Sequence, residues 1–212
     1  MKPSPKKSSL NTVLPTILVL SLFSIAVYGL MIWKEPIPTV AARQKNEQQA
    51  FLHMQKLMQA QSAYIQKDFN ENGTLEYARF IPHLWRSIGD DNRKYDVNLL
   101  PRRTAFAIKR TRAIDGYYFV HKFTVPDPAK PESTIPIDVK KEWGTLMIPA
   151  ADQTGFLTFY TDQHEQIYAN AGKSKLTIPE DPKNLNDWVP IDNPEQLSAI
   201  QKKIAASDAY DL

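Results

Sequence analysis

Residues 41–65 read AARQKNEQQAFLHMQKLMQAQSAYI, and this stretch decides the fold. One set of side chains recurs at steps of three and four, which predicts a helix with one wide apolar face. Such a face packs on a partner helix in another subunit or on the protein's own sheet, and we expect the sheet. The positions on this face are Ala50, Phe51, His53, Met54, Leu57, Met58, Ala60, Tyr64 and Ile65.

Strand signals follow the helix and dominate the second half of the chain. β-Branched and aromatic residues are dense in residues 116–124, 144–148, 156–160 and 166–169, and residues 161–164 make a short hairpin connection. We therefore expect an α+β fold, in which one long amphipathic helix packs on a small antiparallel β-sheet. A short helix is also expected over residues 77–88.

The N-terminal part contains an uninterrupted apolar stretch. Every residue from 12 to 33 is apolar or small and uncharged. At about 1.5 Å rise per residue this length crosses a hydrocarbon core of roughly 30 Å, so we predict a transmembrane helix that contacts membrane lipid. A cleaved signal peptide, and one helix of a larger membrane assembly, are the alternatives. Lys2, Lys6 and Lys7 favour a cytoplasmic N-terminus in a bacterial inner membrane, with the domain in the periplasm.

The expected organisation has five parts. These are a basic N-terminus (1–11), the transmembrane helix (12–33), a Pro-containing linker (34–43), a soluble domain (44–175), and an extended tail with a short C-terminal helix (176–212). Prolines concentrate in the linker, in residues 125–131 and in the tail, where they indicate linker, long loop and extended chain.

The balance of charge and the absence of cysteine exclude several classes of function. The chain has 26 basic and 23 acidic residues, and residues 1–33 contain three lysines and no acid. The remainder is formally neutral, which gives no support for nucleic-acid binding. Without cysteine there is no disulfide, thiolate metal site or covalently attached c-type haem.

Several short stretches, taken in order, resemble a family of uncharacterised, pilin-like bacterial envelope proteins. They are Ala60-Gln-Ser-Ala-Tyr64, Asp68-x-Asn-x-Asn-Gly-x-Leu-Glu-Tyr77, Asp115-Gly-Tyr-Tyr-Phe119, Gly155-Phe-Leu-Thr-Phe-Tyr160 and Gln166-Ile-Tyr168. Related patterns occur in pseudopilins of type II secretion systems. The resemblance implies an N-terminal helix across a small antiparallel sheet and supplies no activity. The leader, processing site and apolar-segment glutamate of true pilins are absent from this sequence.

Residues 68–76 have the spacing of a degenerate calcium loop. Asp68, Asn70, Asn72 and Glu76 stand at positions 1, 3, 5 and 9, Gly73 at the tight bend and Thr74 beside it. Position 12 is Arg79, where a bidentate glutamate should stand. A hydrogen-bonded turn is the alternative, because Asp, Asn and Gly favour turns without an ion. Calcium is the only cofactor that the sequence suggests.

No set of residues indicates an enzyme. The four histidines share no metal-ligand spacing, and there is no nucleophile elbow or phosphate-binding glycine run. We expect a non-enzymatic, membrane-anchored accessory or scaffolding subunit of an inner-membrane assembly, whose partners are other membrane-protein subunits. A pseudopilin-like component of a secretion system and a calcium- or ligand-binding envelope module are the alternatives. A basic run is either a solvated face or a contact for headgroups or an acidic partner: Arg102, Arg103, Lys109, Arg110 and Arg112.

Overall fold

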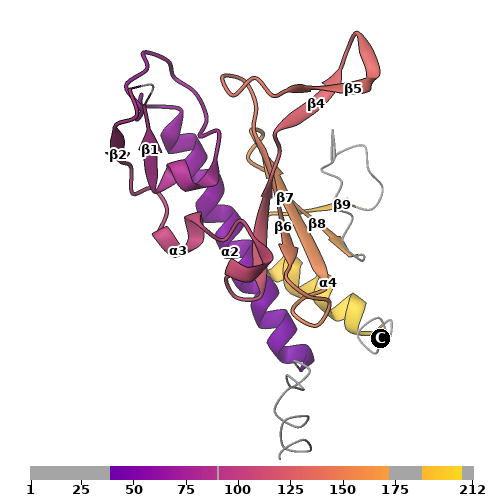
Figure 1. Ribbon diagram of the computed structural model, residues 1–212. Helices are drawn as coiled ribbons and strands as arrows, with labels where there is room; N and C mark the ends of the chain where they lie inside the picture. The colour runs from indigo at the N-terminus through magenta and orange to yellow at the C-terminus, as the bar shows by residue number, and fades with distance from the viewer. Residues whose placement is uncertain (1–38, 90, 172–187, 207–212) are drawn as a thin grey trace, which may run out of the picture. The chain divides into compact units, whose positions relative to one another are not determined.

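The computed structural model describes residues 39–89, 91–171 and 188–206 (Figure 1). The helical elements of this part are α2 (Val40–Tyr64), η1 (Ile81–Leu84), α3 (Arg102–Ala105), η2 (Arg110–Arg112) and α4 (Pro194–Ala206). The strands are β1 (Arg86–Ile88), β2 (Lys94–Asp96), β3 (Tyr117–His121), β4 (Thr124–Asp127), β5 (Lys130–Pro136), β6 (Gly144–Pro149), β7 (Leu157–Asp162), β8 (Ile167–Ala171) and β9 (Trp188–Ile191).

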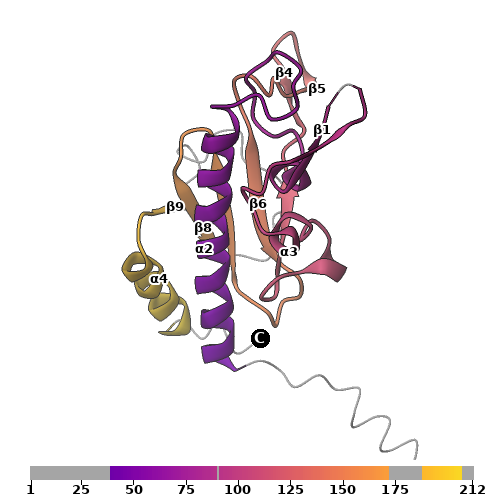
Figure 2. The same cartoon turned by 90° about the vertical axis from the view of Figure 1, so that its left-hand side faces the viewer.

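Helix α2 lies along the central sheet, with α4 on one side of it and the β1–α3 segment on the other (Figure 2). Its first turn is capped by the Thr39 side chain, which accepts a hydrogen bond from the Ala42 amide at 3.2 Å. Phe51, Met54 and Leu57 are fully buried, and α2 contacts the central sheet mainly through β7 and β8. The apolar stripe of the helix therefore supplies one wall of the main core.

The central sheet has five antiparallel strands in the order β3-β6-β7-β8-β9. Phe119 pairs with Met147, Met147 with Phe159, and Phe159 with Ala169. This row joins the core cluster that includes the α2 stripe. Because side chains alternate along a strand, the neighbouring positions point to the other face. They form a second cluster of Leu146, Ile148, Tyr160, Tyr168 and Trp188.

The predicted fold class, an α+β domain with a small sheet behind a transmembrane helix, is wrong. The structure is rich in sheet, because two further two-stranded sheets, β1-β2 and β4-β5, accompany the five-stranded one. β4 and β5 occupy the proline-containing stretch that we interpreted as a long loop, and β9 adds part of the predicted tail to the central sheet. These strands are short or contain proline, so period-two alternation did not reveal them.

The membrane-spanning architecture also requires correction. In the part of the chain that the structure describes, no helix is both long enough and apolar enough to cross a bilayer. The predicted span, residues 12–33, lies outside that part, as do residues 1–11 and residues 34–38 of the predicted linker.

A buried carboxylate joins three elements to one another. Glu47, on α2, is fully buried. Its Oε1 accepts hydrogen bonds from the backbone amides of Phe156 (2.7 Å) and Leu157 (3.2 Å), where β7 begins. Its Oε2 accepts from Nε2 of Gln201, on α4, at 2.7 Å. Burial raises the pKa of Glu47, and these hydrogen bonds oppose that rise.

A second close contact lies beside the Glu47 junction. The hydroxyl of Tyr117 donates to the carbonyl of Leu157 at 2.9 Å. A Cβ added to Gly155 would stand 2.0 Å from that hydroxyl and 2.5 Å from the ring carbon that carries it. Glycine is therefore needed at position 155 to let the Tyr117 ring reach β7.

We expect the stability of the protein to depend on pH through Glu47. With its pKa raised in the folded state, the protonated carboxyl stabilises the fold below pH about 4.5, and this contribution is lost as the pH rises through the folded-state pKa. Relative to Glu47→Gln, which does not titrate, the native protein should gain unfolding free energy between pH 7 and pH 4 in urea titrations. A difference that stays constant over this range would contradict the assignment.

We also expect Gly155→Ala to be strongly destabilising, by about 1–3 kcal/mol, because the added methyl overlaps a buried ring. Gly144→Ala is the matched control. A Cβ there would lie 3.0 Å from the Tyr160 hydroxyl and 3.1 Å from the flexible Lys122 side chain, so it should cost less. Equal losses of thermal stability in the two variants would show that the Tyr117 contact is not the cause.

Candidate binding site

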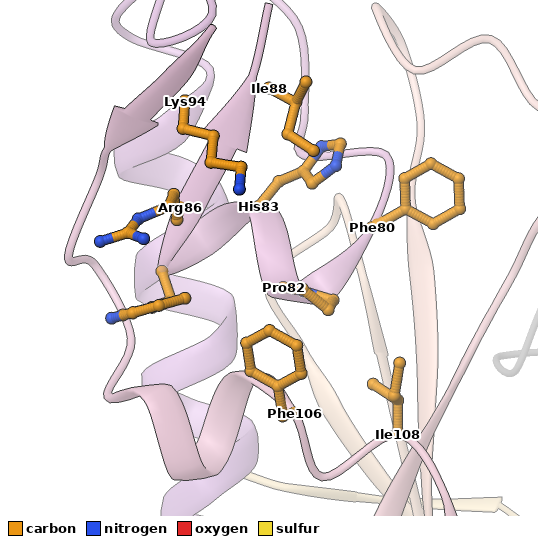
Figure 3. Close-up of a pocket in the computed structure, with 9 residues that line it drawn as sticks. Phe80, Pro82, His83, Arg86, Ile88, Lys94, Phe106 and Ile108 are labelled. Carbon is orange, nitrogen blue, oxygen red and sulfur yellow. The ribbon is translucent and has the colours of Figure 1, made fainter. Parts of the chain in front are cut away.

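A pocket lies among η1, the β1-β2 hairpin and the segment after α3 (Figure 3). Its volume is about 390 Å³. In Figure 3, Arg86 and Lys94 lie on the hairpin side, Phe80 and Ile108 on the opposite side, with Pro82 and His83 between them. Most of the lining is apolar: Phe80, Pro82, His83, Trp85, Arg86, Ile88, Lys94, Phe106 and Ile108.

Local backbone pairing fixes the two sides of the pocket. The short helix η1 has Pro82 in its first turn and buries Ile81 and Leu84 in the core. In the hairpin Ile88 pairs with Lys94, while Ser87 points inward and meets the Tyr64 hydroxyl at 2.8 Å. Because side chains alternate along β1, Arg86 and Ile88 share the outer face.

The remaining side is held against the central sheet. The Phe119 amide donates to the Ala107 carbonyl at 2.7 Å, which fixes the segment after α3 beside β3. Ala107 is buried, whereas Phe106 and Ile108 on either side of it line the pocket. The backbone segments that carry the pocket residues are thus held in place by hydrogen bonds to their neighbours.

Large hydrophobic side chains are exposed around this pocket. Phe80 is 42 % exposed, Ile88 48 % and Ile108 38 %. The patch continues to Phe123, which is 50 % exposed and has its ring centroid 5.7 Å from that of Phe80. Adjacent exposed apolar side chains that line a concave site are typical of surfaces that bind a partner or ligand.

A basic depression of about 770 Å³ adjoins the apolar pocket, and Phe106 lines both. Arg102, Arg103 and Arg112 line the depression, together with Ala113. The guanidinium carbons of Arg86 and Arg102 lie 4.5 and 5.3 Å from the centroid of the Trp85 ring, and that of Arg112 lies 6.0 Å from Phe106. These are cation–π distances, so aromatic rings help to hold the arginines in place.

The pocket and the depression carry positive charge without carboxylates in their walls. Five of the lining residues are arginine or lysine, and none is aspartate or glutamate. Arg86 is paired with Asp96 at 2.8 Å beside the pocket. Burial lowers the pKa of His83, so this residue adds no charge at neutral pH.

The predicted calcium loop folds into a network of internal hydrogen bonds. The Asp68 carboxylate accepts from the amides of Asn72 (3.1 Å) and Gly73 (2.7 Å). The side-chain amides of Asn70 and Asn72 both donate to Oε1 of Glu76, at 3.0 and 3.1 Å. Asn72 Oδ1 accepts from the Thr74 amide at 2.9 Å. The loop thus brings the five predicted ligands together, with Asp68 bonded to backbone amides and Glu76 to the two side-chain amides. The Oδ1 atom of Asn70 is buried without a hydrogen-bond partner among the described residues.

A calcium site in this loop stays a prediction. Within the described residues, no group of three or more histidines, aspartates and glutamates is arranged to hold a metal ion. A calcium ion would have to use side-chain and carbonyl oxygens that include the Asn70 and Asn72 amides, which would need to rotate away from Glu76.

The structure distributes the histidines over separate sites. His53 pairs with Asp115 at 2.9 Å, and His164 lies 3.1 Å from Asp162. His121 meets the Thr145 hydroxyl at 3.0 Å, and burial lowers its pKa to about 4. His83 alone lines the pocket.

Only part of this site is predictable from the sequence. The basic run singled out Arg102, Arg103 and Arg112 as a possible contact for an acidic partner, and the structure places all three in the depression. Phe80, Trp85, Ile88 and Lys94 were missed. The available signal was the cluster of aromatic and basic residues around Trp85-Arg86, in a stretch too short to show periodicity.

Comparisons with known proteins give no guide to the site. No protein-family model, curated protein or solved structure matches this chain. The resemblance to pilin-like envelope proteins stays a prediction.

The calcium interpretation makes a direct prediction for calorimetry. Weak calcium modules bind with Kd values of about 10⁻⁴–10⁻³ M, so titration of the protein should give saturable heat in that range. Asp68→Asn should abolish this heat, because the variant removes the negative charge of the ligand at position 1. Asp91→Asn, in the neighbouring hairpin, is the control. No heat at millimolar calcium would leave the hydrogen-bonded turn as the role of the loop.

Proposed function

We propose that this protein is a non-enzymatic accessory or scaffolding subunit of a protein assembly, and that a partner protein docks in the pocket beside Trp85. The observation that carries the proposal is the exposure of Phe80, Ile88 and Ile108 around one concave site. Full burial of a large hydrophobic side chain from water contributes roughly 1.5–3 kcal/mol. Because these three side chains are already more than half buried, a partner that covers them gains about half of that free energy for each one.

The chemistry of the pocket supports binding in preference to catalysis. General acid–base or nucleophilic catalysis needs an acid, a base or a nucleophile converging on one point. The walls of the pocket contain His83, Arg86 and Lys94 as titratable groups, and no carboxylate or hydroxyl nucleophile. This composition suits an interface, in which aromatic and arginine side chains are enriched.

The β4-β5 hairpin provides a second support. It extends away from the central sheet (Figure 1), and the main contacts of its two strands are with each other. An isolated two-stranded hairpin is marginally stable in water. Its base lies next to Phe123, which continues the pocket surface through Phe80. A partner seated on the pocket would therefore also contact and steady the hairpin. The periplasmic location of such an assembly stays a prediction.

The pocket variant Ile108→Glu tests the proposal, because it places a charge among apolar side chains that a partner must desolvate. Partner recovered with the tagged protein from its native cells should fall at least about tenfold, equivalent to 1.4 kcal/mol. Val189→Glu is the matched control, since Val189 is 46 % exposed and lies on β9, outside the pocket lining.

Thermal unfolding should give closely similar midpoints for both variants, since both positions are on the surface. Equal partner recovery with Ile108→Glu and Val189→Glu would contradict a docking role for the pocket.

A further inference from the structure

The pocket and the adjoining depression differ in chemistry and share one wall. The pocket is mainly apolar, whereas three arginines line the depression, and the Phe106 ring belongs to both. A ligand that occupies both sites must therefore present an apolar group beside negative charge. We propose that the occupant is an acidic segment of a partner protein, which inserts one bulky hydrophobic side chain into the pocket and places carboxylates against Arg102, Arg103 and Arg112. This inference rests on the proposed function and specifies its partner.

The size of the pocket suits a single side chain of a partner. A volume of about 390 Å³ lies near the lower end of the range for ligand pockets, roughly 300–1,000 Å³. A pocket of this size accommodates one large side chain of a partner. Anchor residues at protein interfaces usually bind in this way. The exposed Phe80 and Ile108 would be the side chains that such an anchor covers.

The positive charge of the depression is not matched by carboxylates in its walls. Among the described residues, Arg102, Arg103 and Arg112 form no ion pair with a carboxylate, in contrast to Arg86 with Asp96. A guanidinium group binds a carboxylate through two parallel hydrogen bonds, which a lysine ammonium does not offer. Stacking of Arg102 on Trp85 and of Arg112 on Phe106 reduces the freedom that the two side chains would lose on binding.

The combination of a recess and arginines favours a peptide over other anions. Two guanidinium groups already lie over Trp85, so they compete with a nucleic-acid base for stacking on its ring. The pocket is a recess with a defined apolar lining, whereas attraction to a lipid surface needs only a basic face. An acidic chain with a hydrophobic anchor uses both the recess and the arginines. Oligonucleotide and anionic vesicles are accordingly outcomes of the test.

The test is selection of random peptides on the full-length protein, followed by affinity measurements on three variants. Arg102→Glu/Arg103→Glu reverses the charge of the depression. Lys202→Glu/Lys203→Glu is its matched control, because these exposed neighbours lie on α4. Ile108→Glu blocks the pocket. A single-stranded oligonucleotide and vesicles of anionic phospholipid are measured in parallel.

We expect selected peptides to combine Asp or Glu with one bulky hydrophobic residue. Their affinity should fall at least about tenfold with the arginine reversal and with Ile108→Glu, and should be unchanged with the lysine reversal. Raising the salt concentration should weaken the binding of these peptides, because salt screens the contacts between exposed charges.

Other outcomes separate this inference from the proposed function. The selected peptides could instead be neutral, with an affinity that falls with Ile108→Glu and does not change with the arginine reversal. This outcome would overturn the acidic partner and leave the docking role intact. Peptides indifferent to Ile108→Glu, or none at all, would overturn both. Binding of vesicles or oligonucleotide that is lost with the arginine reversal, without acidic peptides, would identify a different class of ligand and overturn the inference.

Discussion

The hydrogen bonds of Glu47 hold together parts of the chain that are far apart in sequence. Its carboxylate meets the start of β7 and the side chain of Gln201, and Gln201 also donates to the Gln44 carbonyl of α2 at 3.0 Å. Burial of a carboxylate is costly unless its oxygens are satisfied, so this position tolerates little change in the elements around it. The hydrogen bonds of Glu47 therefore fix where α2 lies on the sheet. Because α2 supplies one wall of the core, they also fix the position of η1 and the β1-β2 hairpin, which pack beside that wall.

The sequence predicts the long elements of this fold better than the short ones. The apolar stripe around Phe51 and Leu57 marks α2, because seven turns of helix repeat the signal many times. Dense aromatic and β-branched residues mark the ranges that contain β3, β6, β7 and β8. β1 and β2 have three residues each, which is too few for a period to show, and β4 and β5 contain prolines that favour a loop interpretation. The fold class was wrong because these short strands were missed.

The candidate site illustrates a different limit. A calcium loop is local, so spacing alone brought Asp68, Asn72 and Glu76 to attention. The pocket is not local: Phe80, Lys94 and Ile108 come from separate segments that meet only after folding. Composition around Trp85 hinted at an aromatic and basic surface, but its concave form depends on backbone pairing of Trp85 with the chain that follows β2. No sequence pattern encodes that pairing in a recognisable way.

The prolines of the β4-β5 hairpin have a consequence for solubility. Pro126 pairs with Thr134, and Pro136 with Thr124, so each strand contains a residue that has no backbone N–H to donate. An exposed hairpin with two unbroken edges would be a template for strands of other molecules and would promote aggregation. Here proline interrupts the row of backbone donors on each strand, which disfavours continuous strand addition. The hairpin can therefore extend from the sheet with less tendency to recruit copies of itself, and a binding partner would recognise it mainly through side chains.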